Sequence, residues 1–307
     1  MPRATRNDLT HSPCGDLGSD RNLPAMEQAK LHRRTVLKAG LGTLLAMGAW
    51  PGRRLHGHGA HAAGDSPSDQ PAFLFIVVND THYLSKECDP WMRGMIASMN
   101  KHAEIAFGLH LGDVTDTGTQ PDLEIMAGVL KEAKFPFHTQ PGNHDYRTAT
   151  DRSAYDTVFP GRTNYTFTHN RWQFVGLDST QGQAYEKTKV QPPTLEWLDA
   201  HISELDPALP TVLFTHFPLV APAKYVPLNV EDLLKRFLKF NLVAAFSGHY
   251  HAFTEGKAQG ATLVTNRCCS RARSNHDGTK EKGYWLCRAD KGQVQREFIP
   301  YSGPGTA

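Results

Sequence analysis

Seven side chains in this sequence are of the types that bind divalent metal ions, and each follows an apolar run that predicts a strand. They are Asp80, His82, Asp113, Asn143, His216, His249 and His251. Carboxylates, imidazoles and an amide oxygen suit hard-to-borderline ions, and no thiolate stands among them to demand zinc or copper(I). One ion seldom takes seven ligands from a protein. The set therefore predicts two ions that share a bridging carboxylate.

These residues lie in five separated segments, so the fold must bring them together. Alternate residues of a strand share a face, which lets Asp80 and His82 reach toward one point, and His249 and His251 have the same spacing. Open α/β sheets gather ligands outside the carboxyl ends of their strands. Taken singly, four of the segments are more often a capped turn, a polar strand edge or a core histidine, and the segment with His249 and His251 is about as often a site as not. Their occurrence together favours one site.

The elements that would position this site alternate along the chain. Strands are predicted at residues 73–78, where a continuous apolar run indicates cover on both faces, and at 105–111 and 135–139. Helices are predicted at 90–99, with Asp89 as N-cap and Pro90 at the first position, at 123–133, with Pro121 and Asp122 marking its start, and at 151–158. The second half predicts a hairpin of 164–168 with 173–177, helices at 193–205 and 230–240, strands at 211–215 and 242–246, and short strands within 253–301.

The first 62 residues are not expected to belong to this fold. Arg33 and Arg34 precede a short apolar run at 39–50, a second basic pair, and a small-x-small site at 60–62. This order resembles a twin-arginine export signal, with Val36 a mild departure from the usual residue. Residues 1–62 are therefore predicted as signal and 63–307 as one periplasmic or secreted domain, with Met26 a possible start. The alternative is a basic disordered arm carrying an incidental apolar patch.

Composition and cysteine usage narrow the class of protein further. The formal net charge is +2, and nothing in the sequence suggests a nucleic-acid groove. After the signal no apolar run approaches membrane-spanning length. Cys88, Cys268, Cys269 and Cys287 lack the CxxC spacing of a zinc site. Two alternatives stay open for them: free buried thiols, or a disulfide from Cys268 or Cys269 to Cys287.

The motifs together resemble a known superfamily. Asp80-x-His82, Gly112 to Asp116, Gly142-Asn143-His144-Asp145, His216 and Gly248-His249-x-His251 are similar, in this order, to the calcineurin-like metallophosphoesterases. The segments 174–179 and 195–198 resemble the branch that holds cyclic-nucleotide phosphodiesterases and purple-acid-phosphatase-like enzymes. A purple phosphatase would carry tyrosine at the position of Asp116, which argues against a tyrosine–iron(III) centre here.

This resemblance implies a fold and a set of roles. The fold would be an α/β four-layer sandwich, α/β/β/α, of two mixed sheets flanked by helices. The first metal would be held by Asp80, His82, Asp113 and His251; Asp113 would bridge to a second, completed by Asn143, His216 and His249. The ions would be divalent or mixed-valence Mn, Fe or Zn. His144 would lie over the phosphate or leaving group without binding metal, Asp145 would orient it, and Asn143 and His144 would contact substrate.

The implied activity is hydrolysis of a small phosphodiester or phosphomonoester by a metal-bridging hydroxide. The twin-arginine export machinery would be the partner of the precursor. The alternative function is a catalytically silent phosphate- or metal-binding module on the same fold. That alternative fits poorly with the presence of every ligand and of His144, since a silent descendant usually loses some.

Other residues with chemical potential are given structural interpretations. His110, inside a predicted strand, is interpreted as a core histidine, and Asp178 as a turn residue or an acid beside the ligands. Arg267, Arg271 and Arg273 are candidates for phosphate binding, but a solvated loop is the favoured interpretation.

Overall fold

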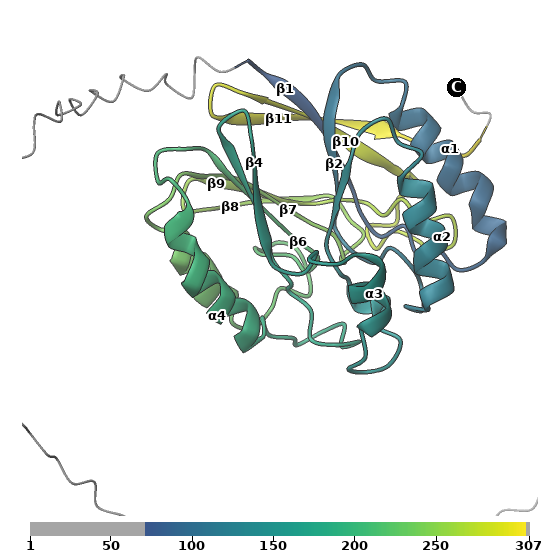
Figure 1. Ribbon diagram of the computed structural model, residues 1–307, viewed down its shortest axis with the longest axis horizontal. Coiled ribbons are helices and arrows are strands. Elements are labelled where there is room, and N and C mark those ends of the chain that lie inside the picture. Colours follow the sequence, from purple (N-terminus) through teal and green to yellow (C-terminus); the bar gives the residue numbers. More distant parts are fainter. Residues whose placement is uncertain (1–70, 305–307) are drawn as a thin grey trace, which may run out of the picture. The chain divides into compact units, whose positions relative to one another are not determined.

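The computed structural model describes residues 71–304, so the predicted signal at residues 1–62 lies outside the described part of the chain. Within that part, none of the helices combines the length and the apolar character that crossing a membrane requires. The described residues form two β-sheets with helices on their outer faces (Figure 1).

The first sheet has the strand order β11-β10-β1-β2-β3. Its strands β1 (Phe73–Val78), β2 (Ile105–His110) and β3 (Phe137–Thr139) are parallel. The hairpin of β10 (Gly283–Asp290) and β11 (Gln293–Pro300) joins β1 antiparallel. The sheet is therefore mixed. β3 begins later than the predicted residue 135 because Pro136 has no N–H to donate to a ladder.

The second sheet has the order β4-β5-β6-β7-β9-β8. Its parallel centre comprises β5 (Trp172–Gly176), β6 (Thr211–Thr215), β7 (Leu242–Ser247) and β9 (Ala261–Thr265). The edge strands β4 (Tyr165–His169) and β8 (Thr254–Ala258) pair antiparallel with β5 and β9. The predicted hairpin is β4–β5. This sheet too is mixed.

Helices cover the outer face of each sheet (Figure 1). α1 (Asp89–Met99), α2 (Gln120–Leu130) and α3 (Ser153–Val158) pack on the first sheet, and α4 (Pro192–His201) and α5 (Val230–Leu234) on the second. α2 starts at Gln120, next to the predicted start at Pro121, because the Thr119 hydroxyl caps it, accepting from the Asp122 N–H. α5 is shorter than predicted, since a 3-10 turn, Lys235–Phe237, replaces its last turns.

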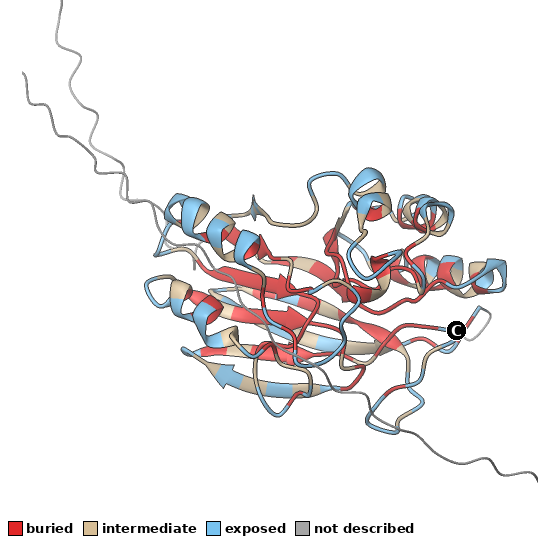
Figure 2. Ribbon diagram, turned by 90° about the horizontal axis from the view of Figure 1, so that it is seen from below, coloured by how far each residue is buried: buried red, intermediate tan, exposed pale blue. Residues whose placement is uncertain are grey.

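Alternation along the strands creates three apolar layers. On β1, Ile76 and Val78 face α1 and α2, whereas Phe75 and Val77 face the second sheet. A third cluster, which includes Leu213 and Leu233, lies between the second sheet and α4 and α5. Figure 2 shows the buried strands in the middle and the exposed outer turns of the helices. The predicted four-layer α/β/β/α sandwich is confirmed.

Candidate metal centre

The seven predicted ligands converge at one end of the paired sheets. Asp80 and His82 follow β1, Asp113 follows β2, and Asn143 follows β3, so the first sheet supplies four side chains. The second sheet supplies the other three, His216 after β6 and His249 and His251 after β7. All seven are buried, and the most exposed of them is 8% accessible. The site is thus shared between the carboxyl ends of two sheets rather than one.

The first group of potential ligands comprises Asp80, His82, Asp113 and His251. Nε2 of His251 lies 3.1 Å from Oδ1 of Asp80, and Nε2 of His82 lies 3.4 Å from Oδ2 of Asp113. The two Nε2 atoms, of His82 and His251, are 3.2 Å apart. These four atoms surround a common point with the donor set expected for one divalent ion.

The second group comprises Asp113, His216 and His249, with Asn143 beside them. Nε2 of His216 lies 3.4 Å from Oδ1 of Asp113 and 3.2 Å from Oδ1 of Asn143. Asp113 therefore directs Oδ2 toward the first group and Oδ1 toward the second. This is the position that a bridging carboxylate between two cations would occupy.

Each of the four histidines is held by a hydrogen bond through its other ring nitrogen. Nδ1 of His82 donates to Oδ1 of Asp116 at 3.0 Å. Nδ1 of His216 donates to the Leu111 carbonyl at 2.8 Å, and Nδ1 of His251 donates to the Ser274 carbonyl at 3.2 Å. His249 instead donates Nε2–H to the Tyr185 carbonyl at 2.8 Å. These acceptors fix each ring and leave the opposite nitrogen with its lone pair directed into the group.

Lone pairs brought this close indicate a cation. When Nδ1 of both rings donates outward, the Nε2 atoms of neutral His82 and His251 are both acceptors, and they face each other at 3.2 Å. Two buried acceptors so placed repel unless a proton or a metal ion lies between them. The donor set and its convergence therefore fit a metal.

Electrostatics prepares these groups to bind metal. Burial by itself raises the pKa of Asp80, but His251 and the other imidazoles outweigh it and hold this pKa well below its usual range. Burial also raises the pKa of Asp113, but His216 and His82 outweigh burial, so this pKa is lowered from its usual value. Burial, and then His216, lowers the pKa of His249 to about 3. Ionised carboxylates and a neutral imidazole are the forms that ligate metal.

His251 differs from the other histidines in its protonation. Burial would lower its pKa, but the adjacent Asp80 carboxylate outweighs burial and raises the pKa to about 11. Without metal, the first group therefore carries a proton at neutral pH. A cation entering the group displaces that proton, so metal binding there is coupled to proton release.

The backbone at the site is unusual. Five of the seven residues have left-handed conformations, with φ of 51° at Asp80, 45° at His82, 50° at Asp113, 62° at His249 and 47° at His251. Such values are uncommon outside glycine and cost of order 1–3 kcal/mol each unless surrounding structure holds them. They turn the chain sharply after β1, β2 and β7, so side chains near the strand ends face back toward one point.

A glycine packs the turns against one another. Gly112 has φ of 91°, and a Cβ there would lie 2.7 Å from the Gly142 nitrogen and 2.8 Å from Nδ1 of His216. A side chain at this position would therefore separate the turns after β2 and β3 and push away a ligand.

His144 and Asp145 have separate tasks. Nδ1 of His144 donates to the Asp116 carbonyl at 2.9 Å, so its Nε2 is the nitrogen left for the cavity. Asp145 instead accepts from the N–H groups of Gly142, Val114 and Thr115 at 2.9–3.2 Å. Asp145 thereby ties the turn after β3 to the turn after β2, while the Asp116 carbonyl is the partner of the His144 ring. Burial, and then Asp113, raises the pKa of Asp145 to about 6.

A cavity of about 220 Å³ opens over the ligands. Its wall includes five ligands and His144, and also Arg273, which the sequence named as a candidate for phosphate binding but interpreted as part of a solvated loop. Tyr185, Tyr225 and His276 also line it, and the sequence did not single these three out. Asp116, known from sequence only as the residue in place of a tyrosine, links His82 to Arg273. The metals would therefore lie at the floor of a small cavity with a basic residue in its wall.

The structural interpretations of other residues mostly hold. His110 is a buried core residue, 3.0 Å from the Thr81 hydroxyl through Nε2. Asp178 pairs with Arg152 and belongs to neither group of potential ligands. Cys88, Cys268, Cys269 and Cys287 are all free, so the disulfide alternative is wrong.

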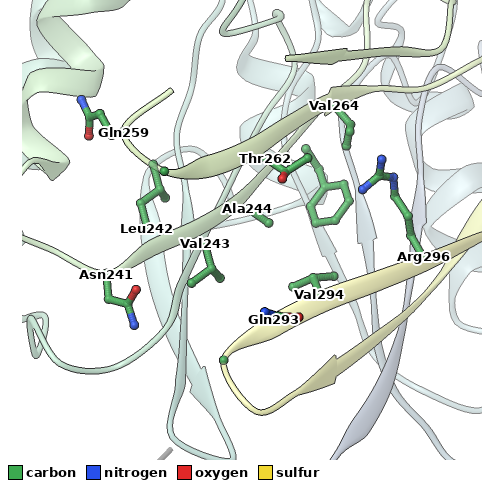
Figure 3. Close-up of a pocket in the computed structure, with 13 residues that line it drawn as sticks. Asn241, Leu242, Val243, Ala244, Gln259, Thr262, Val264, Gln293, Val294 and Arg296 are labelled. Atoms are coloured by element: carbon green, nitrogen blue, oxygen red, sulfur yellow. The ribbon is translucent and has the colours of Figure 1, made fainter. Parts of the chain in front are cut away.

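A larger cavity, of about 480 Å³, is distant from this chemistry. Figure 3 shows it between β7 and β9 of the second sheet and the β10–β11 hairpin of the first. Arg296 is the one charged residue in its wall, and this side chain pairs with Glu255 and lies over the rings of Trp285 and Phe253. A metal-binding set is lacking there among the described residues, so the small cavity is the candidate active site.

Comparison with known proteins places this arrangement in context. Residues 73–253 match the family described as calcineurin-like phosphoesterase. A probable cyclic nucleotide phosphodiesterase of Fibrobacter succinogenes is 28% identical over 150 residues, which cover 46% of this chain and 56% of that protein. The glycerophosphodiester phosphodiesterase GpdQ of Enterobacter lignolyticus is 26% identical over 219 residues, which cover 62% and 76%.

A solved structure shares the fold. The purple acid phosphatase PPD1 from yellow lupin seeds superposes with a TM-score of 0.57 at 14% identity, over 76% of this chain and 52% of that one. At that identity the likeness concerns the arrangement of sheets and helices alone. The chain spans about half the length of the first of the curated relatives.

Proposed function

Because the chain belongs to the calcineurin-like phosphoesterase family, we propose that it hydrolyses phosphate esters with two divalent metal ions. One observation carries this proposal. The seven side chains predicted from sequence form two groups that share a single carboxylate, Asp113. The first ion would be held by Asp80, His82, Asp113 and His251, and the second by Asp113, Asn143, His216 and His249.

Bound cations would supply positive charge for the phosphate oxygens and lower the pKa of a water molecule. The chain's own residues do the rest. The outward hydrogen bonds of the four histidines keep the ligand atoms in place before substrate arrives, which lowers the reorganisation needed in the transition state. Asn143 adds an oxygen without a negative charge, so its group keeps more net positive charge than a third carboxylate would leave.

His144 is the proposed proton donor. The Asp116 carbonyl holds its Nδ1–H, and its ring packs edge-on against His82 with centroids 4.7 Å apart. With the ring so fixed, Nε2 is the atom available to a leaving oxygen or a phosphate oxygen in the cavity. This assignment supports esters whose alcohol must be protonated as it departs.

The substrate class follows from cavity size and from the relatives. A cavity of about 220 Å³ suits a small ester rather than a polymer. The two curated relatives are named for cyclic nucleotides and glycerophosphodiesters, which supports a small phosphodiester or a related monoester as substrate. The metals we propose are Mn, Fe or Zn, which accept this mixture of imidazole and oxygen ligands.

Metal removal tests this function. When a chelator removes the metal from residues 63–307, the protein should lose hydrolysis of bis(p-nitrophenyl) phosphate, p-nitrophenyl phosphate and cyclic nucleotides. The reason is that the proposed metal ions supply the positive charge that stabilises the phosphate oxygens. Adding back Mn, Fe or Zn singly should restore it, with metal analysis run on the same samples. A loaded protein with two ions per chain and no turnover of any ester would favour the silent binding module instead.

We also propose export by the twin-arginine route. Residues 1–64 fused to a folded reporter should carry it to the periplasm, whereas replacing Arg33 and Arg34 with lysine should hold it in the cytoplasm, as measured by fractionation. Lysine keeps the positive charge, so the change removes only the arginine pair. The matched control replaces Arg53 and Arg54, the basic pair after the apolar run, and should leave export intact. Undiminished export of the first variant would contradict the proposal.

A further inference from the structure

A loop between β9 and β10 brings an arginine to the candidate active site. Arg273 lines the small cavity together with His82, Asp113 and His144, although 157 residues separate it from Asp116, which it contacts. Its side chain is 41% exposed, so it stands at the rim rather than in the core. Of the three arginines in this loop, only Arg273 borders the cavity.

Asp116 holds the guanidinium in a fixed direction. Its Oδ1 accepts from Nε of Arg273 at 2.7 Å and forms an ion pair with Nη2 at 2.6 Å, and the same oxygen accepts from Nδ1 of His82 at 3.0 Å. An arginine carries five N–H donors. Within residues 71–304, Asp116 accepts from Nε and pairs with Nη2, while Nη1 has no partner, so the N–H groups of Nη1 stay available to a ligand.

The loop itself is fastened to the metal site. The Ser270 hydroxyl accepts from the N–H of Arg273 at 3.0 Å. The Ser274 carbonyl accepts from Nδ1 of His251, and the N–H of His276 donates to the His251 carbonyl at 3.0 Å. The arginine is therefore positioned relative to a ligand on each side, through Asp116 to His82 and through its own loop to His251.

We propose that Arg273 recognises a charged phosphate oxygen of the substrate and thereby favours phosphomonoester dianions over phosphodiester monoanions. This inference rests on the function proposed above. A monoester has three terminal oxygens and a diester has two. Two cations at the floor of the cavity can take two of these oxygens, so the third, present only in the monoester, is free for a guanidinium.

The test compares substitutions at Arg273 with a matched change in the same loop. Arg273→Gln should lower kcat/KM for p-nitrophenyl phosphate about 10- to 100-fold, the range of a hydrogen bond between charged groups. For bis(p-nitrophenyl) phosphate the loss should stay below about 3-fold. Arg273→Lys should recover part of the monoester activity. Arg271→Gln removes an exposed arginine that, within residues 71–304, pairs with Glu87 alone, at 3.8 Å. This variant should hydrolyse both substrates at the wild-type rate.

Two further readouts separate this role from a structural one. Binding of inorganic phosphate to the metal-loaded protein, by calorimetry, should weaken about 10- to 100-fold in Arg273→Gln. Metal content should stay at the wild-type value, because Asp116 still accepts from His82. Lost metal, or equal losses for both esters, would overturn the proposal and make Arg273 a support for His82.

Failure of the proposed function has its own signature. If wild-type protein hydrolyses neither ester, phosphate titration still judges Arg273: weaker binding by Arg273→Gln upholds anion recognition, and unchanged binding overturns it. If wild-type protein hydrolyses both esters and Arg273→Gln matches it on each, the proposed function stands and this inference falls.

Discussion

Replacing Asp113 with asparagine should remove both metal ions and nearly all activity. Its two carboxylate oxygens face different ligand groups, Oδ2 toward His82 and Oδ1 toward His216, each at 3.4 Å. An amide has one oxygen with full acceptor capacity and no charge, so it bridges two cations poorly. We expect metal content to fall from near two ions per chain to below one. Since misplacement by about 1 Å costs about 10²-fold, kcat/KM should fall at least that far.

Variants of ligands that belong to one group alone serve as comparisons for Asp113→Asn. His251→Ala should weaken mainly the first ion, and His216→Ala mainly the second, as measured by metal analysis after dialysis. Asp290→Asn removes a carboxylate in the β10–β11 hairpin that, among the described residues, pairs with Arg288 alone, and should keep both ions. One ion in fully active wild-type protein, or two ions in Asp113→Asn, would contradict the shared-carboxylate arrangement.

The same variant can be examined through stability. A ligand that binds only the folded protein raises its stability in proportion to the logarithm of its concentration over Kd. Wild-type protein should therefore gain Tm on metal addition, and Asp113→Asn should gain little. Without metal the two should unfold at similar temperatures, which would show that the substitution acts on binding rather than on the fold.

His144→Asn should keep both ions and slow turnover by about 10²–10⁴-fold, the usual contribution of a general acid. The imidazole is held by the Asp116 carbonyl and adjoins His82 without belonging to either main ligand group. His144, His82 and Asp116 do form a smaller potential metal-binding group. However, Oδ1 of Asp116 already accepts from His82 and Arg273. We therefore expect metal analysis to show no loss.

The leaving group distinguishes proton donation from phosphate binding. Nitrophenolate departs with little protonation, so the defect of His144→Asn should shrink for nitrophenyl esters and be largest for alkyl esters. His201→Asn, on α4 with its Nδ1 on the Trp197 carbonyl, is the matched histidine control and should behave as wild type. Equal losses for good and poor leaving groups would assign His144 to phosphate binding. An emptied site would make it a ligand.

Most of the fold was predictable because its elements carry strong local patterns. The apolar run of β1 and the fully buried β6 sit at the predicted residues. Element ends were less accurate, since they depend on side-chain contacts rather than on periodicity. Asp151, predicted as the start of α3, instead accepts from the N–H and hydroxyl of Ser153 and so precedes the helix.

The ligands could be predicted because each combines a metal-binding residue type with a strand end. Arg273 offers no such signal, since the loop between β9 and β10 has no periodicity, and its contact with Asp116 joins distant parts of the chain. The sequence therefore favoured a solvated loop for it. Asp145 is a different case: the family resemblance implied that it orients His144, whereas in the structure backbone donors of two turns occupy its oxygens.

The left-handed turns after β1, β2 and β7 restrict which replacements evolution can try. Besides glycine, asparagine, aspartate and histidine are the residues most often left-handed. Glutamate or cysteine at Asp80 or Asp113 would offer an atom to a metal but would meet a backbone that disfavours it. The residue types allowed at these positions are thus restricted by metal coordination and by the backbone torsion angle, and the two restrictions allow nearly the same residues. Substitutions that persist at these positions should therefore be exchanges among these few residue types.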